Sequence, residues 1–143
     1  MTNKSNEVVG VWEVNAPDAP FVWHVMTFTP YGTMSQSNPH AGNPDESDSS
    51  GHGVWEERRG PDGNTRIVGK FVEFKADHKT GEYIGKGEIW FDFTVDGDKL
   101  SGTSAAYRYN AKGECMKGPL ASPIHGTRIV FTAPPTKVIH KDQ

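Results

Sequence analysis

The chain has 143 residues, with 15 Lys and Arg against 18 Asp and Glu, which gives a formal net charge of −3. This near balance argues against a nucleic-acid partner and against a polybasic membrane patch. The single cysteine, Cys115, excludes an internal disulfide and a zinc site built on several cysteines. The polar residues 1–9 lack the apolar segment of a signal peptide, and no stretch approaches the roughly 18 apolar residues of a transmembrane helix. We therefore expect a cytoplasmic domain without a membrane partner.

Glycine and proline interrupt the sequence too often for long helices. The longest run without either is 70–80, and it opens with Lys-Phe-Val-Glu-Phe, a composition typical of a strand. We predict eight strands, in chain order at 8–14, 21–29, 33–37, 53–59, 66–74, 82–95, 99–109 and 127–132. Tight turns separate most of them, and Pro61-Asp62-Gly63-Asn64 is the clearest hairpin signal.

Eight strands joined mostly by short turns predict an antiparallel up-and-down meander. Closure removes the two free edges of such a sheet, so we expect an all-β, eight-stranded barrel with room for side chains or one small ligand. The whole chain, 1–143, is predicted to be one domain, with its core at about 8–132 and mobile tails at 1–7 and 133–143. Two longer connections are expected, a flap over one mouth at 38–51 and a shorter one at 114–124.

Two tryptophans occupy equivalent positions in a short internal repeat. Gly10-Val11-Trp12-Glu13 recurs as Gly53-Val54-Trp55-Glu56, so each indole follows a strand glycine by two residues and points to the same face. Two indoles that enter one interior would form the floor and wall of a pocket. The alternative interpretation is that both are ordinary core residues.

The ends of the predicted barrel carry a motif that resembles the lipocalin and wider calycin pattern. It combines Gly10-x-Trp12 on the first strand with Arg128 in the last. The resemblance implies a barrel whose floor is closed by the indole, with the guanidinium lying across it. Residues 8–132 also resemble a group of uncharacterised bacterial lipocalin-like proteins, on the pieces Gly51-His52-Gly53-Val54-Trp55, Gly85-Lys86-Gly87-Glu88-Ile89, Asp98-Lys99-Leu100-Ser101-Gly102-Thr103 and Gly126-Thr127-Arg128-Ile129.

Strand alternation sorts the candidate polar groups. On 21–29 we expect His24 and Met26 to point inward with Phe28, and the same face to continue to Gln36 after the turn. His24 would then be either a neutral base in an apolar barrel or a hydrogen-bonded core histidine. The carboxylates of Glu57 and Glu73, near strand ends, are expected to be solvated.

The strand 82–95 has two distinct faces. We expect a solvent face, Glu82, Lys86, Glu88 and Asp92, and an inner apolar wall, Tyr83, Gly85, Gly87, Ile89, Phe91 and Phe93. The two glycines on the wall either leave volume for a ligand or let the sheet curve. Trp90 would lie outside and mark a homodimer contact. On the next strand the inward face stays open, but an inward Tyr107 hydroxyl would anchor a ligand or act as a general acid.

Metal and cofactor sites have no support in the sequence. The six histidines show neither a strand-borne pair two residues apart nor the H-E-x-x-H pattern, and no glycine-rich loop opens a helix to hold a phosphate. We therefore predict no metal and no cofactor.

The prediction for function is capture of a small, largely apolar molecule inside the barrel. The alternative is a cofactor-independent isomerase, cyclase or lyase in which His24 and Tyr107 move a proton. A filled barrel that serves as a structural or dimer module is the third interpretation. The predicted ligand-binding residues are Trp12, His24, Met26, Gln36, Trp55, Phe71, Phe91, Tyr107 and Arg128, of which Arg128 is more structural in character.

Overall fold

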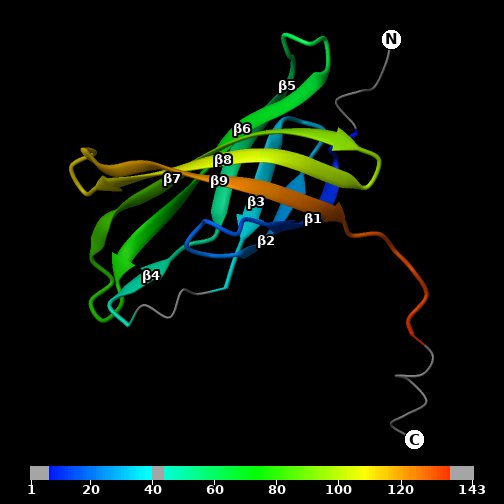
Figure 1. Ribbon diagram of the computed structural model, residues 1–143. Coiled ribbons are helices and arrows are strands. Elements are labelled where there is room, and N and C mark those ends of the chain that lie inside the picture. The colour runs from blue at the N-terminus through cyan, green and yellow to red at the C-terminus, as the bar shows by residue number, and fades with distance from the viewer. Residues whose placement is uncertain (1–6, 40–43, 136–143) are drawn as a thin grey trace, which may run out of the picture.

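A computed structural model of the protein describes residues 7–39 and 44–135. The described chain forms nine strands and no helix (Figure 1). In chain order they are β1 (Gly10–Asn15), β2 (Trp23–Phe28), β3 (Thr33–Ser37), β4 (Glu46–Asp48), β5 (Gly51–Arg59), β6 (Thr65–Asp77), β7 (Tyr83–Asp96), β8 (Lys99–Asn110) and β9 (Cys115–Arg128).

Eight of these strands form a closed antiparallel ring. Around the ring the order is β1, β2, β3, β5, β6, β7, β8 and β9, and the pairing of β9 with β1 closes it. The ninth strand, β4, pairs with residues 75–77 of β6, beyond the segment that pairs with β5. The predicted all-β, eight-stranded, up-and-down barrel is confirmed.

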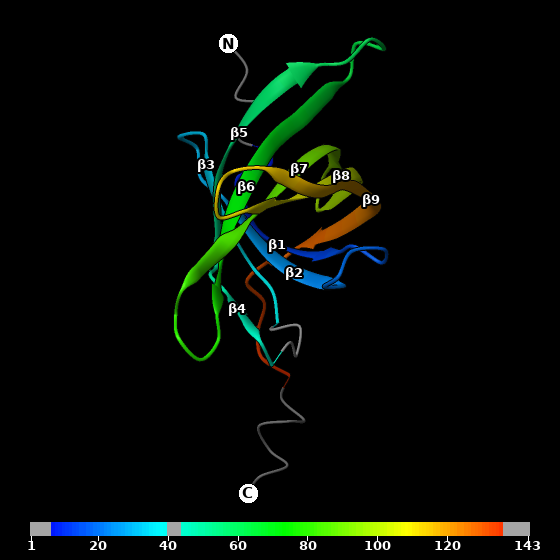
Figure 2. The same ribbon diagram turned by 90° about the vertical axis from the view of Figure 1, so that its left-hand side faces the viewer.

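The strand lengths make the barrel lopsided. β6 to β9 contain 12 to 14 residues each, whereas β1 to β3 contain five or six. The long hairpins therefore extend past the short strands, as Figures 1 and 2 show for β5–β6 and for β6–β7. Because of this difference in length, β1 to β3 enclose only part of the interior that β6 to β9 border.

The last strand was predicted wrongly at 127–132. It spans 115–128, so the expected connection at 114–124 is largely strand, and Phe131 lies outside the sheet with its side chain 100% exposed. Pro119 and Pro123 made this segment resemble a loop. The strand accommodates it through register shifts against β8, where Gly118 adopts φ +122° and a Cβ would lie 2.6 Å from the carbonyl oxygen of Ala106.

The expected flap at 38–51 contains β4 and the first residue of β5. Residues 40–43 of that segment lie outside the described part of the chain, as do most residues of the two expected tails.

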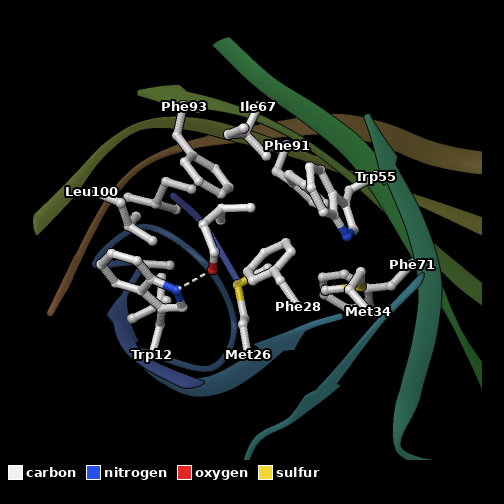
Figure 3. Packing of buried hydrophobic residues seen from close by; sticks show 14 residues of the cluster. Trp12, Met26, Phe28, Met34, Trp55, Ile67, Phe71, Phe91, Phe93 and Leu100 are labelled. Carbon is white, nitrogen blue, oxygen red and sulfur yellow. Dashed lines mark hydrogen bonds between the residues drawn. The ribbon is translucent and has the colours of Figure 1, made fainter. Parts of the chain in front are cut away.

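One end of the barrel is filled by aromatic and aliphatic side chains. Trp12, Phe28 and Phe93 are fully buried there (Figure 3). Phe28 lies centrally, with edge-to-face contacts at centroid distances of 6.2 Å to Trp55, 5.8 Å to Phe91 and 5.7 Å to Phe93. Such contacts add to the free energy gained by removing the rings from water. This end is therefore the stable core of the domain.

The expected contact between the first and last strands is present. Trp12 and Arg128 are cross-strand partners, and the guanidinium carbon lies 4.4 Å from the indole centroid. Arg128 also donates to the carbonyl oxygen of Val9 at 2.7 Å and to Asp98 at 2.9 Å, while the Trp12 Nε1 donates to the carbonyl oxygen of Val8 at 2.8 Å. These contacts seal the filled end with the segment that precedes β1.

Trp90 lies on the outer face as predicted, with its side chain 45% exposed. The ammonium of Lys70 lies 4.8 Å from its ring, and its Nε1 donates to Glu88 at 3.0 Å. Glu88 faces outward but is nearly buried by these neighbours, so its expected solvation is wrong. A dimer contact at Trp90 stays a prediction. In the described ranges, no helix has the length and apolar character needed to cross a membrane.

Candidate functional site

A cavity of about 310 Å³ occupies the end of the barrel opposite Trp12. Its apolar wall combines residues from five strands, Val14, Met26, Phe71, Ile89, Phe91 and Ile124. Ala16, Ala19 and Phe21, in the connection from β1 to β2, line its side. A mostly apolar hollow of this size lies at the lower end of the range for small-molecule sites.

Small residues explain why this end stays open. Gly87, Ser104 and Ala106 replace large side chains on the inner faces of β7 and β8. A Cβ built on Gly87 would meet its first neighbours, Ile89 and Lys75, only at 3.7 Å. Gly85 is different, because a Cβ there would lie 2.1 Å from the carbonyl oxygen of Tyr109. Gly87 therefore leaves volume, which is one of the two roles expected for these glycines, whereas Gly85 permits close strand approach, a role that was not expected.

A chain of polar groups forms one side of the cavity. His24 Nε2 donates to the carbonyl oxygen of Phe21 at 2.8 Å, and His24 Nδ1 lies 2.5 Å from Gln36 Oε1. Gln36 Nε2 donates to Glu73 Oε2 at 3.2 Å. Three strands, β2, β3 and β6, therefore hold one histidine, one amide and one carboxyl group in a row.

Both His24 nitrogens are therefore engaged, one by the Gln36 amide and the other by the carbonyl oxygen of Phe21. At the other end of the chain of polar groups, the carboxyl group of Glu73 faces the cavity.

Glu73 is the functional residue that the sequence analysis misplaced. Its expected solvation is wrong, because the residue is only 5% exposed and lines the cavity. Burial raises its pKa above the ordinary value, while Lys75 and the Gln36 amide oppose that increase. Strand alternation could have predicted this position, because Phe71, Glu73 and Lys75 lie on the same face of β6 and that face lines the cavity.

Two ion pairs stand at the cavity mouth. Lys75 Nζ lies 2.5 Å from Asp48 Oδ1, and Arg108 Nη2 lies 2.7 Å from Glu46 Oε1. Both carboxylates belong to β4, and their partners come from β6 and β8. The mouth therefore presents charged groups of both signs above an apolar floor. The two ion pairs hold β4 against β6 and β8 at this mouth.

The nine predicted ligand-binding residues separate into three groups. The structure brings five to the cavity wall, His24, Met26, Phe71, Phe91 and Tyr107. Gln36 lies directly behind the wall, bonded to His24 and Glu73. Trp12, Trp55 and Arg128 belong to the filled end and do not line the cavity.

Tyr107 lies at the rim rather than inside. It pairs with Glu88 of β7, whose side chain is on the outer face, whereas Ser104 and Ala106 line the interior. The register shift in β8 between Ala106 and Arg108 occurs at this residue. The acid–base role expected for Tyr107 together with His24 stays a prediction.

A second hollow, on the outer face, is a weaker candidate for a ligand site. It lies around Gly69 and is bordered by Glu56, Arg58, Lys70 and Asp92. These charges are engaged in surface ion pairs, with Arg58 bonded to Glu56 and Asp92 to Arg66. It is more open than the cavity and carries less apolar wall, so the interior is the better candidate.

The fold and the cavity define a closed antiparallel barrel with one filled and one hollow end. Among residues 7–39 and 44–135, no three His, Cys, Asp or Glu side chains are grouped to hold a metal ion. Comparison of the chain with protein-family models, with curated proteins and with solved structures gives no match.

The raised pKa of Glu73 predicts a pH-dependent stability. A folded-state pKa above the unfolded value of about 4.5 means that the native protein holds this proton more tightly, so native stability falls as pH rises from 4.5 through the folded pKa. Glu73→Gln removes this loss. We expect the free energy of unfolding of the variant, relative to wild type, to increase with pH across that window in urea titrations. Parallel curves for the two proteins would contradict a raised pKa.

Proposed function

We propose that this protein binds a small, largely apolar molecule in the hollow end of its barrel, and that the barrel is of the lipocalin-like, calycin type. The observation that carries the binding proposal is the cavity of about 310 Å³, which is lined by Met26, Phe71 and Phe91 among others. The packing of Arg128 across Trp12 supports the lipocalin-like classification. Apolar walls supply affinity by burial, and the few polar groups orient the ligand.

The charged mouth indicates how the ligand would be oriented. Its apolar part would contact the floor, and a polar end would lie near Lys75 and Arg108, whose partners Asp48 and Glu46 come from β4. The ligand is therefore expected to be amphipathic, with a compact ring or branched apolar body.

The test fills the cavity from within. Gly87→Leu places a side chain in the free volume without a backbone collision, since the nearest atoms are side-chain atoms at 3.7 Å. We expect wild type to bind the neutral fluorophore N-phenyl-1-naphthylamine saturably, and Gly87→Leu to weaken that binding about tenfold or more, a loss of roughly 1.4 kcal/mol. Fluorescence titration measures both affinities.

The matched control adds similar volume outside the barrel. Ala105 faces outward opposite Trp90, so Ala105→Leu is expected to keep the wild-type affinity. A folded Gly87→Leu that binds the fluorophore as wild type does would overturn the proposal, as would a signal from wild type that never saturates.

A further inference from the structure

The carboxyl group of Glu73, on the cavity wall, has one oxygen held by a hydrogen bond and a second oxygen that no donor in the described part of the chain holds. Gln36 bonds Glu73 Oε2, and within the described chain no donor engages Glu73 Oε1. This second oxygen lies 3.9 Å from the place where a Gly87 side chain would begin, so it borders the free volume. A ligand in the cavity would meet it directly.

We propose that Glu73 is a general acid–base group and that the molecule taken into the cavity is a carbon acid, a compound with a C–H bond next to a carbonyl group. This inference rests on the proposed function, because the substrate must first enter the cavity. The reaction class is proton transfer within one molecule, which makes substrate and product isomers.

The proposed step needs no oxidant, reductant or second substrate. The Glu73 carboxylate takes the proton from carbon, and the electron pair of the broken C–H bond moves into an enolate whose charge lies on the carbonyl oxygen. In a substrate with a C=C bond next to that carbon, the enolate extends over the double bond, and the Glu73 carboxylic acid returns the same proton to the far carbon of this conjugated system as the double bond shifts toward the carbonyl group. Atoms and charge balance, and the carboxylate is regenerated.

The neighbouring cation suits this chemistry. Lys75 follows Glu73 by two residues on the same face of β6, and its ammonium lines the cavity. Asp48 accepts one of its three N–H groups, so others are available to a carbonyl oxygen that gains charge.

Polar neighbours and the apolar floor prepare the carboxyl for the task. Gln36, itself bonded to His24, fixes one oxygen and directs the other toward the cavity. These two are positioning residues, since neither presents a free group to the ligand. Phe71 and Phe91 limit water around the carboxylate, which makes it a stronger base than in solution, and the raised pKa of Glu73 agrees with this environment.

Several charges face Glu73 and will shape its titration. Lys75 on its own strand favours the carboxylate, Asp48 from β4 opposes it, and His24 of β2 favours it electrostatically. At the mouth, Arg108 of β8 is paired with Glu46. The pH profile is therefore expected to follow one group, Glu73, with its pKa above the ordinary range.

The test uses 5-nitrobenzisoxazole, a flat aromatic probe of base catalysis. A base removes its single reactive C–H proton, the electron pair of that bond forms a nitrile, and the N–O bond breaks with its pair going to a phenolate oxygen, which gives a coloured product. We expect wild type to show saturable turnover that rises with pH as Glu73 ionises. Glu73→Gln is expected to lower kcat/KM about 100-fold or more, in a folded variant that still binds the fluorophore saturably.

The control is a second inward carboxyl outside the cavity. Glu57 shares the interior-facing side of β5 with Trp55, and among residues 7–39 and 44–135 its buried Oε2 has no hydrogen-bond partner. Glu57→Gln is expected to keep wild-type turnover. Turnover no faster than free acetate, or undiminished in Glu73→Gln, would overturn the acid–base role even if the fluorophore binds. Absence of fluorophore binding would instead refute the proposed binding function.

Discussion

Phe28→Ala is expected to lower the free energy of unfolding by about 3–5 kcal/mol, as large-to-small changes at fully buried aromatic positions do. The Phe28 side chain is 1% exposed and contacts three rings, those of Trp55, Phe91 and Phe93. These neighbours come from β5, two strands from β2 around the ring, and from β7, across the interior from β2. Removal of the ring therefore leaves a void that a rigid, closed sheet cannot fill by collapse. Urea unfolding followed by tryptophan fluorescence measures the loss.

The matched control makes the same chemical change without the packing. Phe131 lies beyond β9 and is fully exposed, so Phe131→Ala is expected to stay within about 0.5 kcal/mol of wild type. A Phe28→Ala protein that unfolds at the wild-type urea concentration would show that the filled end is not the centre of stability.

Most of the barrel could be predicted because its signals are local. Turn residues such as Asp62 and Gly63 separate the strands, and alternation along β2 correctly placed His24, Met26 and Phe28 inside. Closure followed from the need to remove sheet edges, and Trp12 with Arg128 indicated which strands meet.

The last strand could not be read in the same way. Pro119 and Pro123 are typical of a loop, yet β9 carries both, with register shifts that depend on the facing residues of β8. In contrast, the apolar run Ile129, Val130 and Phe131 has the composition of a strand but lies beyond the end of β9, and only Ile129 of the three donates its N–H to β1, to the carbonyl oxygen of Val11 at 2.8 Å. Whether such a segment becomes a strand depends on whether another strand pairs with it, and that partner can lie far away in the sequence.

The candidate site shows the same division. Its apolar walls were predicted from strand alternation, whereas the position of Glu73 depends on Gln36, which lies 37 residues earlier in the chain. A carboxylate near a strand end is normally solvated, and only the closed barrel brings the amide behind it. Likewise, both indoles were expected in the pocket, but Trp12 and Trp55 fill the opposite end.

The two ends of the barrel thus carry different properties. The filled end supplies stability through packed rings, and the hollow end keeps buried polar groups that lower stability but can contact a ligand. Variants at one end are therefore expected to change stability, and variants at the other to change binding or turnover. Glycine substitutions test this division directly, because the same added methyl group meets different surroundings.

Gly53→Ala is expected to lower the free energy of unfolding by about 3 kcal/mol, at the upper end for overpacking. Gly53 of β5 pairs with Phe71 of β6, where the two strands approach closely. A Cβ on Gly53 would lie 1.9 Å from the carbonyl oxygen of Lys70. Because the obstacle is backbone, the strands must separate and weaken their hydrogen bonds. Denaturant unfolding, with circular dichroism to confirm the sheet, measures the cost.

Gly87→Ala is the matched variant, and its expected effect has the opposite sign. The new methyl group meets only side-chain atoms at ordinary contact distance, and the backbone there has no positive φ. Alanine also restricts the unfolded chain, so a gain of about 0.4–1 kcal/mol is expected. Equal destabilisation of the two variants would mean that Gly87, like Gly53, serves strand packing. The volume beside Glu73 would then follow from sheet curvature alone and not from the missing side chain.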